Sequence, residues 1–420
     1  MRDWKILFDN LKTLSKGQKT MKSKIVTHSI LLAISKIFTA NIPGPGMKNR
    51  INEGGSMKSL PPVLLLGFSL LTAALFLPST GLASDKGESR ESMASSKPTK
   101  TAPSTSRSFA FDNDAFVPGS RDQDYTYGLN LTFVGKGAED QWASLHVPLN
   151  WLDQRIGLNR QVSDSIVSSK IEYGLFGFTS EDITLAQPVQ GDRPYASLIY
   201  VSSTSERYDA ARQVSWQSTL TFGFMGLNIV GDIQDKIHSK IGSQRPQGWN
   251  SQISEGGEPT ARYSVARQRL MYKSDSGLEI KTTTQASVGY ITEANWSLSL
   301  RVGDIHTPWV SFNPELTSYG EKSIHSQVGK VSEQYFWTGF SLKVRAYNSF
   351  LQGQLRDSVV TYDSDELNHG IVEAWVGYTI ALKEGYSFSY LVRGHTSELK
   401  RGVGNRSVIW GGLQITKNMI

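Results

Sequence analysis

The sequence predicts an all-β protein, a transmembrane antiparallel β-barrel of twelve strands with one short loop helix. After residue 107, apolar side chains recur at every second position through many stretches, which is the period of a β-strand. Many of these stretches reach the length of about 9–11 residues that a tilted membrane strand needs. Tyr and Trp are frequent near their ends, as in the aromatic girdles of outer-membrane barrels. A soluble sandwich with one wet face per sheet would show the same alternation, and strand length favours the barrel.

The first 107 residues differ in composition from the rest and divide into three parts. Residues 57–83 combine a lysine, an apolar run and the small-residue site GLA, which predicts a signal peptide cleaved after Ala83. The run is nearly long enough to span a membrane as a helix, but three prolines bracket it. Residues 1–56 are an N-terminal extension of uncertain role, with Met57 as an alternative start. Residues 84–107 lack core-forming side chains and predict a disordered spacer.

Charge and cysteine content exclude several classes of protein. The formal net charge of +6 comes from the leader, because residues 108–420 hold 28 Lys and Arg against 32 Asp and Glu, a charge of −4. We therefore expect no nucleic-acid partner, and nothing in the sequence indicates a protein partner. The chain has no cysteine, which removes disulfides, thiolate metal sites and cysteine nucleophiles.

Strict alternation defines the strands. In the stretch YTYGLNLTFV, Tyr, Leu and Phe at odd positions 125 to 133 alternate with polar or small residues, so Thr126 belongs to the set predicted to face the lumen. Lys343, Arg345 and Arg393 fall in the same inward set of later strands. The predicted strands are 106–116, 125–136, 168–182, 193–208, 211–226, 260–273, 278–291, 295–303, 334–348, 371–382, 386–398 and 407–416. An even number of strands suits a closed bacterial barrel, which leaves no backbone edge in lipid.

One loop predicts a helix instead. In NIVGDIQDKIHSKIG the apolar residues are spaced by three or four, as on one face of a helix, and are Val230, Ile233, Ile237 and Ile241. Asn228 is the expected N-cap and Gly242 the expected stop. Gln234 and His238, four residues apart, share a face beside this stripe. A single histidine on a loop helix is also compatible with an ordinary surface residue.

Known catalytic patterns are missing, whereas a series of polar motifs lies near the strand ends. The sequence has no G-x-S-x-G elbow, phosphate loop, HExxH or EF-hand pattern. The motifs present are FDNDAF, DYTYGL, FTSEDI, GDRPYASLIY, IQDKIHSKIG and QGWNSQI. Their order and spacing resemble the outer-membrane lipid A 3′-O-deacylase family over residues 108–420, most densely over 109–259.

The resemblance implies a function and a set of site residues. Members are twelve-stranded outer-membrane barrels that hydrolyse the 3′-linked acyloxyacyl ester of lipid A, with a Ca²⁺-dependent site just inside the outer rim. The matching residues here are Asn113, Asp114, Thr126 and His238. The resemblance implies that Asn113, Asp114 and Thr126 hold Ca²⁺ and that His238 activates water. Asn113 and Asp114 are equally compatible with a simple turn at a strand end.

These residue types suit ester hydrolysis by water. Neutral histidine accepts a proton near pH 7, and Ca²⁺ bound by oxygen ligands stabilises the developing oxyanion. In the turn itself, Pro118 and Gly119 are expected to reverse the chain, and Asp122 and Asp124 to cap or solvate it. A second group of carboxylates, Asp182, Asp192 and Glu258, is compatible either with the site or with ordinary turns and ion pairs.

Two other functions remain open on the sequence. One is a non-catalytic outer-membrane barrel of the same family, acting as a pore or binding protein. The other is an outer-membrane phospholipase. The leading prediction is a bacterial outer-membrane lipid A deacylase that acts on lipopolysaccharide.

Overall fold

The structure is a computed structural model that describes residues 105–117, 123–135, 137–158, 166–321 and 331–419. The predicted extension (1–56) and signal peptide (57–83) lie outside the described residues, and so do residues 84–104 of the predicted spacer. The last three residues of that spacer, 105–107, instead begin the first strand. Their side chains alternate in burial, and their backbone pairs with the last strand and the second strand.

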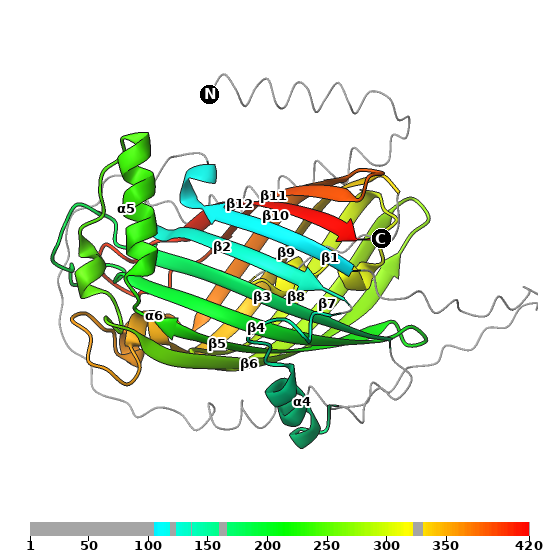
Figure 1. Cartoon of the computed structure of the whole chain (residues 1–420), viewed down its shortest axis with the longest axis horizontal. Coiled ribbons are helices and arrows are strands. Elements are labelled where there is room, and N and C mark those ends of the chain that lie inside the picture. The colour runs from blue at the N-terminus through cyan, green and yellow to red at the C-terminus, as the bar shows by residue number, and fades with distance from the viewer. Residues whose placement is uncertain (1–104, 118–122, 136, 159–165, 322–330, 420) are drawn as a thin grey trace, which may run out of the picture. The chain divides into compact units, whose positions relative to one another are not determined.

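Twelve antiparallel strands form a closed barrel, as predicted (Figure 1). Each strand pairs with its neighbours in sequence, and the last strand pairs with the first. The strands are β1 (Thr105–Asn113), β2 (Asp124–Val134), β3 (Ile166–Thr179), β4 (Ala196–Asp209), β5 (Val214–Met225), β6 (Glu258–Lys273), β7 (Leu278–Gly289), β8 (Ile291–Asp304), β9 (Glu333–Asn348), β10 (Gly370–Ala381), β11 (Tyr386–His395) and β12 (Val408–Met419).

The two ends of the barrel differ in their connections. Residues 210–213, 274–277 and 382–385 make short turns at one end, which we call the short-turn end. At the other, long-loop end, the connection from β5 to β6 carries α5 (Ile229–Ile241) and that from β9 to β10 carries α6 (Ser349–Gln352), and both helices lie at the same end in Figure 1. The functional motifs therefore gather at the long-loop end.

The sequence predicted one loop helix, and the structure contains more. Besides α5 and the single turn of α6, the connection from β2 to β3 forms α4 (His146–Arg155). Its apolar residues at 147, 149, 151 and 152 do not follow a helical period, so the pattern did not predict it. Short 3₁₀ turns are η2 (Asp114–Phe116), η4 (Gly248–Ser251), η5 (Trp309–Ser311), η6 (Pro314–Leu316) and η7 (Ser364–Glu366). Among the described residues, none of the helices has both the length and the apolar character to cross a membrane.

Charged side chains face the lumen and neutralise one another. Lys343, Arg345 and Arg393 are buried, as the alternation predicted. Lys343 and Arg393 both pair with Glu373 across neighbouring strands. Since an isolated charge inside a protein is costly, this pairing makes the polar interior compatible with close packing.

Residues 305–321, which we call the lumen segment, cross the interior of the barrel. Glu315 of this segment lies 2.9 Å from Lys281 of β7, and Glu321 lies 3.2 Å from Arg262 of β6. Farther along, the Tyr200 hydroxyl donates to the Gly320 carbonyl at 2.8 Å. These contacts with β4, β6 and β7 hold the segment inside the barrel.

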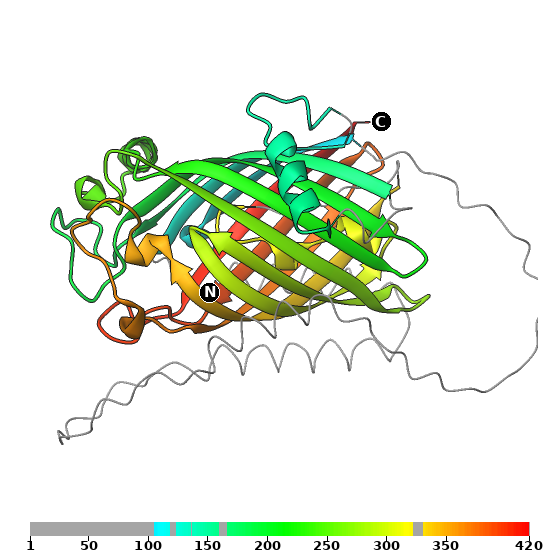
Figure 2. The same ribbon diagram turned by 90° about the horizontal axis from the view of Figure 1, so that it is seen from below.

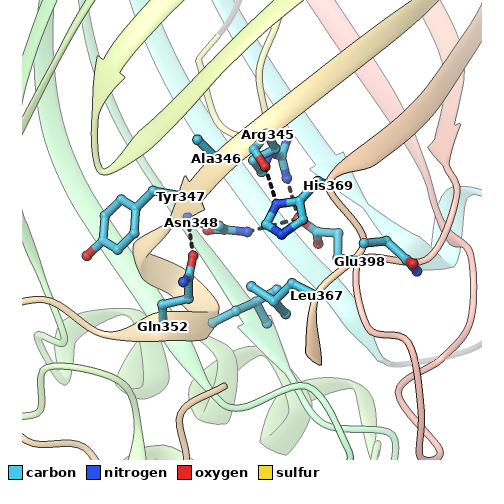
Figure 3. Close-up of a pocket in the computed structure, with 10 residues that line it drawn as sticks. Arg345, Ala346, Tyr347, Asn348, Gln352, Leu367, His369 and Glu398 are labelled. Carbon is cyan, nitrogen blue, oxygen red and sulfur yellow. Dashed lines mark hydrogen bonds and ion pairs between the residues drawn. The ribbon is translucent and has the colours of Figure 1, made fainter. Parts of the chain in front are cut away.

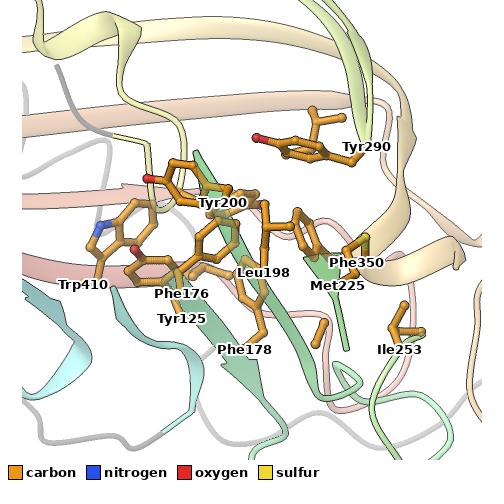
Figure 4. Close-up of a cluster of buried hydrophobic side chains, with 14 residues drawn as sticks. Tyr125, Phe176, Phe178, Leu198, Tyr200, Met225, Ile253, Tyr290, Phe350 and Trp410 are labelled. Atoms are coloured by element: carbon orange, nitrogen blue, oxygen red, sulfur yellow. The ribbon is translucent and has the colours of Figure 1, made fainter. Parts of the chain in front are cut away.

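An aromatic cluster packs inside the long-loop half of the barrel (Figure 4). Phe176 and Phe178 of β3 contact Phe350 of α6, with ring centroids 5.3 and 5.4 Å apart. Tyr125 of β2 packs on Trp410 of β12 at 4.9 Å. This cluster joins β2, β3 and β12 to α6 and gives the barrel a hydrophobic core at this end.

Glu398, in the loop after β11, is the centre of a buried charge cluster (Figure 3). Its carboxylate pairs with Arg193 and with Arg345. Tyr319 of the lumen segment and Asn348 also donate hydrogen bonds to it, each at 2.8 Å. Burial alone raises the pKa of the Glu398 carboxyl, but the guanidinium groups of Arg193 and Arg345 outweigh burial and hold this pKa well below its usual range.

This lowered pKa predicts how acid affects stability. The stabilisation from charged Glu398 is present above the pKa of about 4.3 that glutamate has in an unfolded chain, and is lost as pH falls through the lower folded pKa. We expect the difference in unfolding free energy between the wild type and Glu398→Gln to be constant from pH 7 to about 5 and to shrink below about 4. Urea titrations at each pH measure it. A difference that grows on acidification would contradict the assignment.

Candidate active site

The turn after β1 is organised by Asn113 and Asp114. The Asn113 side chain caps η2 by accepting from the Ala115 amide at 2.7 Å. Its amide nitrogen donates to the backbone carbonyl of Thr126 at 2.6 Å. Asp114 is buried, and its carboxylate accepts from the Gln123 amide at 2.7 Å. The structure therefore brings Asn113 and Thr126 together across the β1–β2 hairpin.

Thr126 does not follow the alternation that the sequence predicted. The pairing between β2 and β3 shifts register between Tyr125 and Tyr127, so Thr126 is the extra residue of a β-bulge. Tyr125 consequently faces the lumen and packs on Trp410. The Thr126 hydroxyl instead meets α5, accepting a hydrogen bond from Gln234 at 2.9 Å. The predicted inward position of Thr126 is thus wrong, because a bulge reverses the facing of the residues before it.

Helix α5 packs against the outer wall of the barrel, not inside its rim. Val230 of the helix and Trp249 of η4 contact outward-facing apolar residues of β1 to β4, which are Phe111, Leu129, Leu175 and Ile199. Figure 1 shows the helix standing at the long-loop end beside these strands. The Tyr127 hydroxyl donates to the Val230 carbonyl and fixes the first turn of the helix to β2.

The apolar stripe of α5 is only partly used for this packing. Val230 is fully buried and Ile233 is half-buried against the wall, but Ile237 is 40% exposed. Asn228 occupies the predicted N-cap position, although its side chain accepts from Gln252 at 2.8 Å rather than from the helix. Gly242 ends the helix with φ of 73°, the left-handed conformation that favours glycine.

Gln234 connects the helix to the strand and to the following loop. Its amide nitrogen donates to the Thr126 hydroxyl, and its carbonyl oxygen accepts from the Trp249 indole at 2.9 Å. Both Gln234 and His238 are buried, on the shared face that the spacing predicted. His238 is one helical turn beyond Gln234, and its Nδ1 lies within hydrogen-bonding distance of the Gln244 carbonyl. Asn113, Thr126 and Gln234 are therefore connected by hydrogen bonds between wall and helix, and His238 lies one helical turn beyond Gln234.

Sequence reasoning did not identify the aromatic anchors of this group. Tyr127 and Trp249 hold α5 in place through the two hydrogen bonds described above. Tyr127 lies in the DYTYGL motif and Trp249 in the QGWNSQI motif, so the motifs could have identified both residues. The sequence does not show that the helix lies on the outer wall, so the alternation predicts only that Tyr127 is an aromatic residue facing the membrane.

Close packing at Gly231 gives a test of this arrangement. A Cβ added at Gly231 would lie 2.5 to 2.9 Å from atoms of the Trp249 indole, which cannot move aside without disturbing Gln234. We expect Gly231→Ala to displace α5 from the wall and to increase proteolytic cleavage within residues 229–257. Ser239→Ala, on the exposed face of the same helix, is the matched control. Equal protection in both variants would contradict the packing.

The remaining acidic residues stabilise the loops. Asp124 does not cap the turn as predicted, because it is buried between Arg193 at 3.4 Å and Arg406 at 3.0 Å. Asp192 also pairs with Arg406, at 2.7 Å. Pro118, Gly119 and Asp122 lie outside the described residues.

Two further carboxylates have local partners. Asp182 accepts from its neighbour Thr184, and these hydrogen bonds lower the pKa of the Asp182 carboxyl. Glu258, at the start of β6, accepts from the Leu355 amide at 2.6 Å. The sequence is compatible with two roles for Asp182, Asp192 and Glu258, in the site or in ordinary turns and ion pairs. The contacts in the structure are those of loop hydrogen bonds and ion pairs.

The donor set around Asn113 is of the kind that a calcium ion takes. It comprises one carboxylate, one amide oxygen and one hydroxyl, all hard oxygen donors, which Ca²⁺ combines with backbone carbonyls and water. In the described part of the chain, no group of three or more His, Asp or Glu side chains is placed to hold a metal. A cation here would therefore bind through a site of low charge, with Asp114 as its carboxylate.

Comparison with known proteins identifies a family and several similar solved structures. Residues 68–419 match the family model described as outer membrane protein LpxR. The solved structure of LpxR from Salmonella typhimurium aligns over 75% of this chain and 100% of its own, with 17% identity and a TM-score of 0.57. The β domain of a Bordetella autotransporter aligns over 76% of this chain and 100% of its own, with 10% identity and a TM-score of 0.36.

No curated protein sequence matches the chain. The family match, however, covers most of the 420 residues, including every motif on which the resemblance rested. The fold is that of an outer-membrane barrel, so both the family and the location predicted from the sequence are confirmed. The chain belongs to the LpxR family of outer membrane proteins.

Proposed function

We propose that this protein is a lipid A 3′-O-deacylase, which hydrolyses the 3′-linked acyloxyacyl ester of lipid A with a water molecule activated by His238. The observation that carries the proposal is the position of His238, on a helix that packs against the outer wall of the barrel beside Asn113 and Thr126. A lipid substrate approaches such a site sideways within the membrane. It does not have to enter the lumen.

The surroundings of His238 suit a general base. A histidine whose Nδ1–H donates to a backbone carbonyl is held in the tautomer that leaves Nε2 free of a proton. The Gln244 carbonyl lies at Nδ1, so Nε2 is the atom that accepts the proton of water. Water then attacks the ester carbonyl, and the proton passes to the leaving alkoxide. The products are the free acyloxyacyl acid and a 3′ hydroxyl on lipid A.

Ca²⁺ is proposed as the cofactor, held by Asn113, Asp114 and Thr126. When bound it would supply a Lewis acid near the ester carbonyl, where negative charge develops. The protein residues orient this corner of the site. Asn113 ties β1 to the bulge at Thr126, and Gln234 ties the bulge to the helix that bears His238.

The pore alternative receives no support from the lumen. The lumen segment crosses the interior and forms ion pairs with Lys281 and Arg262. A phospholipase would use the same group of residues, so the substrate must be tested directly.

The proposed function is tested in cells that express the chain. Mass spectrometry of their lipid A is expected to show the loss of an acyloxyacyl unit relative to cells with an empty vector. Heat-modifiable gel mobility confirms that the barrel is folded. Unchanged lipid A together with hydrolysed phospholipids would replace the proposal with a phospholipase.

The calcium proposal predicts sensitivity to chelators. Purified protein treated with EDTA is expected to lose hydrolysis of lipid A, and added Ca²⁺ is expected to restore it. Mg²⁺ is not expected to substitute, because it demands near-octahedral geometry and gives up its water reluctantly. Activity that is indifferent to EDTA would remove Ca²⁺ from the mechanism.

A further inference from the structure

Helix α4 lies outside the barrel, against its wall. The chain leaves β2 at the short-turn end, and α4 then covers the outer face of β4 and β5 (Figures 1 and 2). The buried Leu158, just after the helix, packs with Val214 and Trp216, two outward residues of β5. The helix therefore occupies a place where a barrel strand would otherwise meet lipid.

The wall beneath α4 is unusually polar. Toward the long-loop end, the outward residues of β5 are Phe222 and Phe224, which are exposed and apolar. Toward the short-turn end, the outward positions of β4 and β5 include Ser203, Arg207 and Ser218. An arginine facing hydrocarbon is energetically costly, most of all at the middle of the bilayer. Uncovered, this part of the wall would be a poor lipid-facing surface.

The buried face of α4 satisfies these polar groups. Asp153 is fully buried, and its carboxylate lies 3.0 Å from the Arg207 guanidinium. The same carboxylate accepts hydrogen bonds from Ser218 and Tyr263, both at 2.7 Å. Just before the helix, the Leu145 amide donates to Ser203 at 2.9 Å. One aspartate thus neutralises the arginine and satisfies the hydroxyl groups of two strands.

The opposite face of this region exposes several apolar side chains, alongside the polar Gln154 and Arg155. Trp142 and Val147 are each 82% exposed, Trp151 is 54% exposed and Ile156 is 44% exposed. Short turns face the periplasm in outer-membrane barrels, which puts α4 on the periplasmic side. Tryptophan is enriched where membrane proteins meet the headgroup region.

We propose that α4 is a membrane-embedded part of the barrel wall, which replaces a polar region of strand surface with an apolar face that contacts phospholipids of the periplasmic leaflet. The inference is independent of the catalytic proposal, because it concerns the other end of the barrel. It assigns to α4 a lipid surface as its partner and to Asp153 the role of fastening the helix to the wall.

The test uses single-cysteine variants, since the chain has no cysteine of its own. Val147→Cys carries a nitroxide spin label on the exposed face of α4. Leu413→Cys, on the outer face of β12, is the lipid-facing control, and Asp275→Cys, in a short turn, is the aqueous control. Each labelled protein is reconstituted in phosphatidylcholine vesicles, and its barrel is checked by heat-modifiable mobility. Accessibility to oxygen and to a water-soluble nickel chelate is then measured.

The label at residue 147 is expected to resemble that at 413, with an oxygen-to-nickel ratio several times that at 275. A ratio equal to that at 275 would overturn the proposal, because the face would then be in water. Protection from both oxygen and nickel would also overturn it, because the face would then be covered by protein. In Asp153→Leu the label at 147 is expected to become mobile and accessible to nickel, because the helix loses its attachment to Arg207.

Discussion

Replacing His238 with alanine is expected to lower the rate of lipid A deacylation by about 10²–10⁴-fold, the usual contribution of a general base. The imidazole is buried on the face of α5 that meets the wall, and its Nδ1 is held at the Gln244 carbonyl. Alanine is a good helix former, so it preserves α5 while it removes the proton acceptor and the hydrogen bond to the Gln244 carbonyl. The rate is measured with purified protein and lipid A, by quantifying the released acid.

Lys240→Ala is the matched control for this variant. Lys240 is exposed two residues further along the same helix, so its loss changes the charge of α5 without changing the site. We expect the control to retain the wild-type rate and both variants to show wild-type heat-modifiable mobility. A His238→Ala protein that is folded and fully active would exclude His238 as the base.

Replacing Glu398 with alanine is expected to destabilise the barrel by about 3–5 kcal/mol, the typical effect of removing one partner from a buried ion pair. Glu398 is the common partner of Arg193 and Arg345, so its loss leaves two buried guanidinium groups with one carboxylate fewer. The Tyr319 hydroxyl also loses its acceptor, which loosens the lumen segment. Urea titration followed by heat-modifiable mobility measures the change.

Arg401→Ala, an exposed site in the same loop, controls for the loss of a long side chain there. We expect it to unfold at the wild-type urea concentration. A Glu398→Ala protein as stable as this control would show that the charge cluster does not contribute to the free energy of unfolding, which would contradict the prediction.

The barrel could be predicted from sequence because its signal is local and repeated. Each strand alternates, and closing twelve of them requires no further information. The prediction for β4 was 193–208, and the structure has Ala196–Asp209. The difference arises because Arg193 has an ordinary polar role in the loop, pairing with Glu398 before the strand begins.

The geometry of the site could not be predicted in the same way. Motif matching selected Asn113, Asp114, Thr126 and His238, but the side of the wall on which Thr126 lies depends on one bulge. A bulge adds a single residue and leaves no period in the sequence. The position of α5 outside the barrel follows from contacts between residues about a hundred positions apart, such as Tyr127 and Val230.

The lumen segment and α4 show a similar limit. Glu315 and Asp153 are single acidic residues in long connections, and no pattern around them distinguishes them from solvent-exposed acidic residues. Their roles depend on Lys281 and Arg207, which lie on strands that only the closed barrel brings near. A hydrophobicity pattern carries no information on ion pairs between distant segments, so these pairs can be identified only from the three-dimensional structure.

The most direct test of the proposed function is the position of the ester that the purified, folded protein cleaves. Lipid A is incubated with the wild type or with His238→Ala in the presence of Ca²⁺, and tandem mass spectrometry locates the missing chain. We predict that the wild type removes the acyloxyacyl unit from the 3′ position and that the variant leaves lipid A intact. Loss of a chain from any other position, or intact lipid A with a folded wild-type barrel, would contradict the proposal.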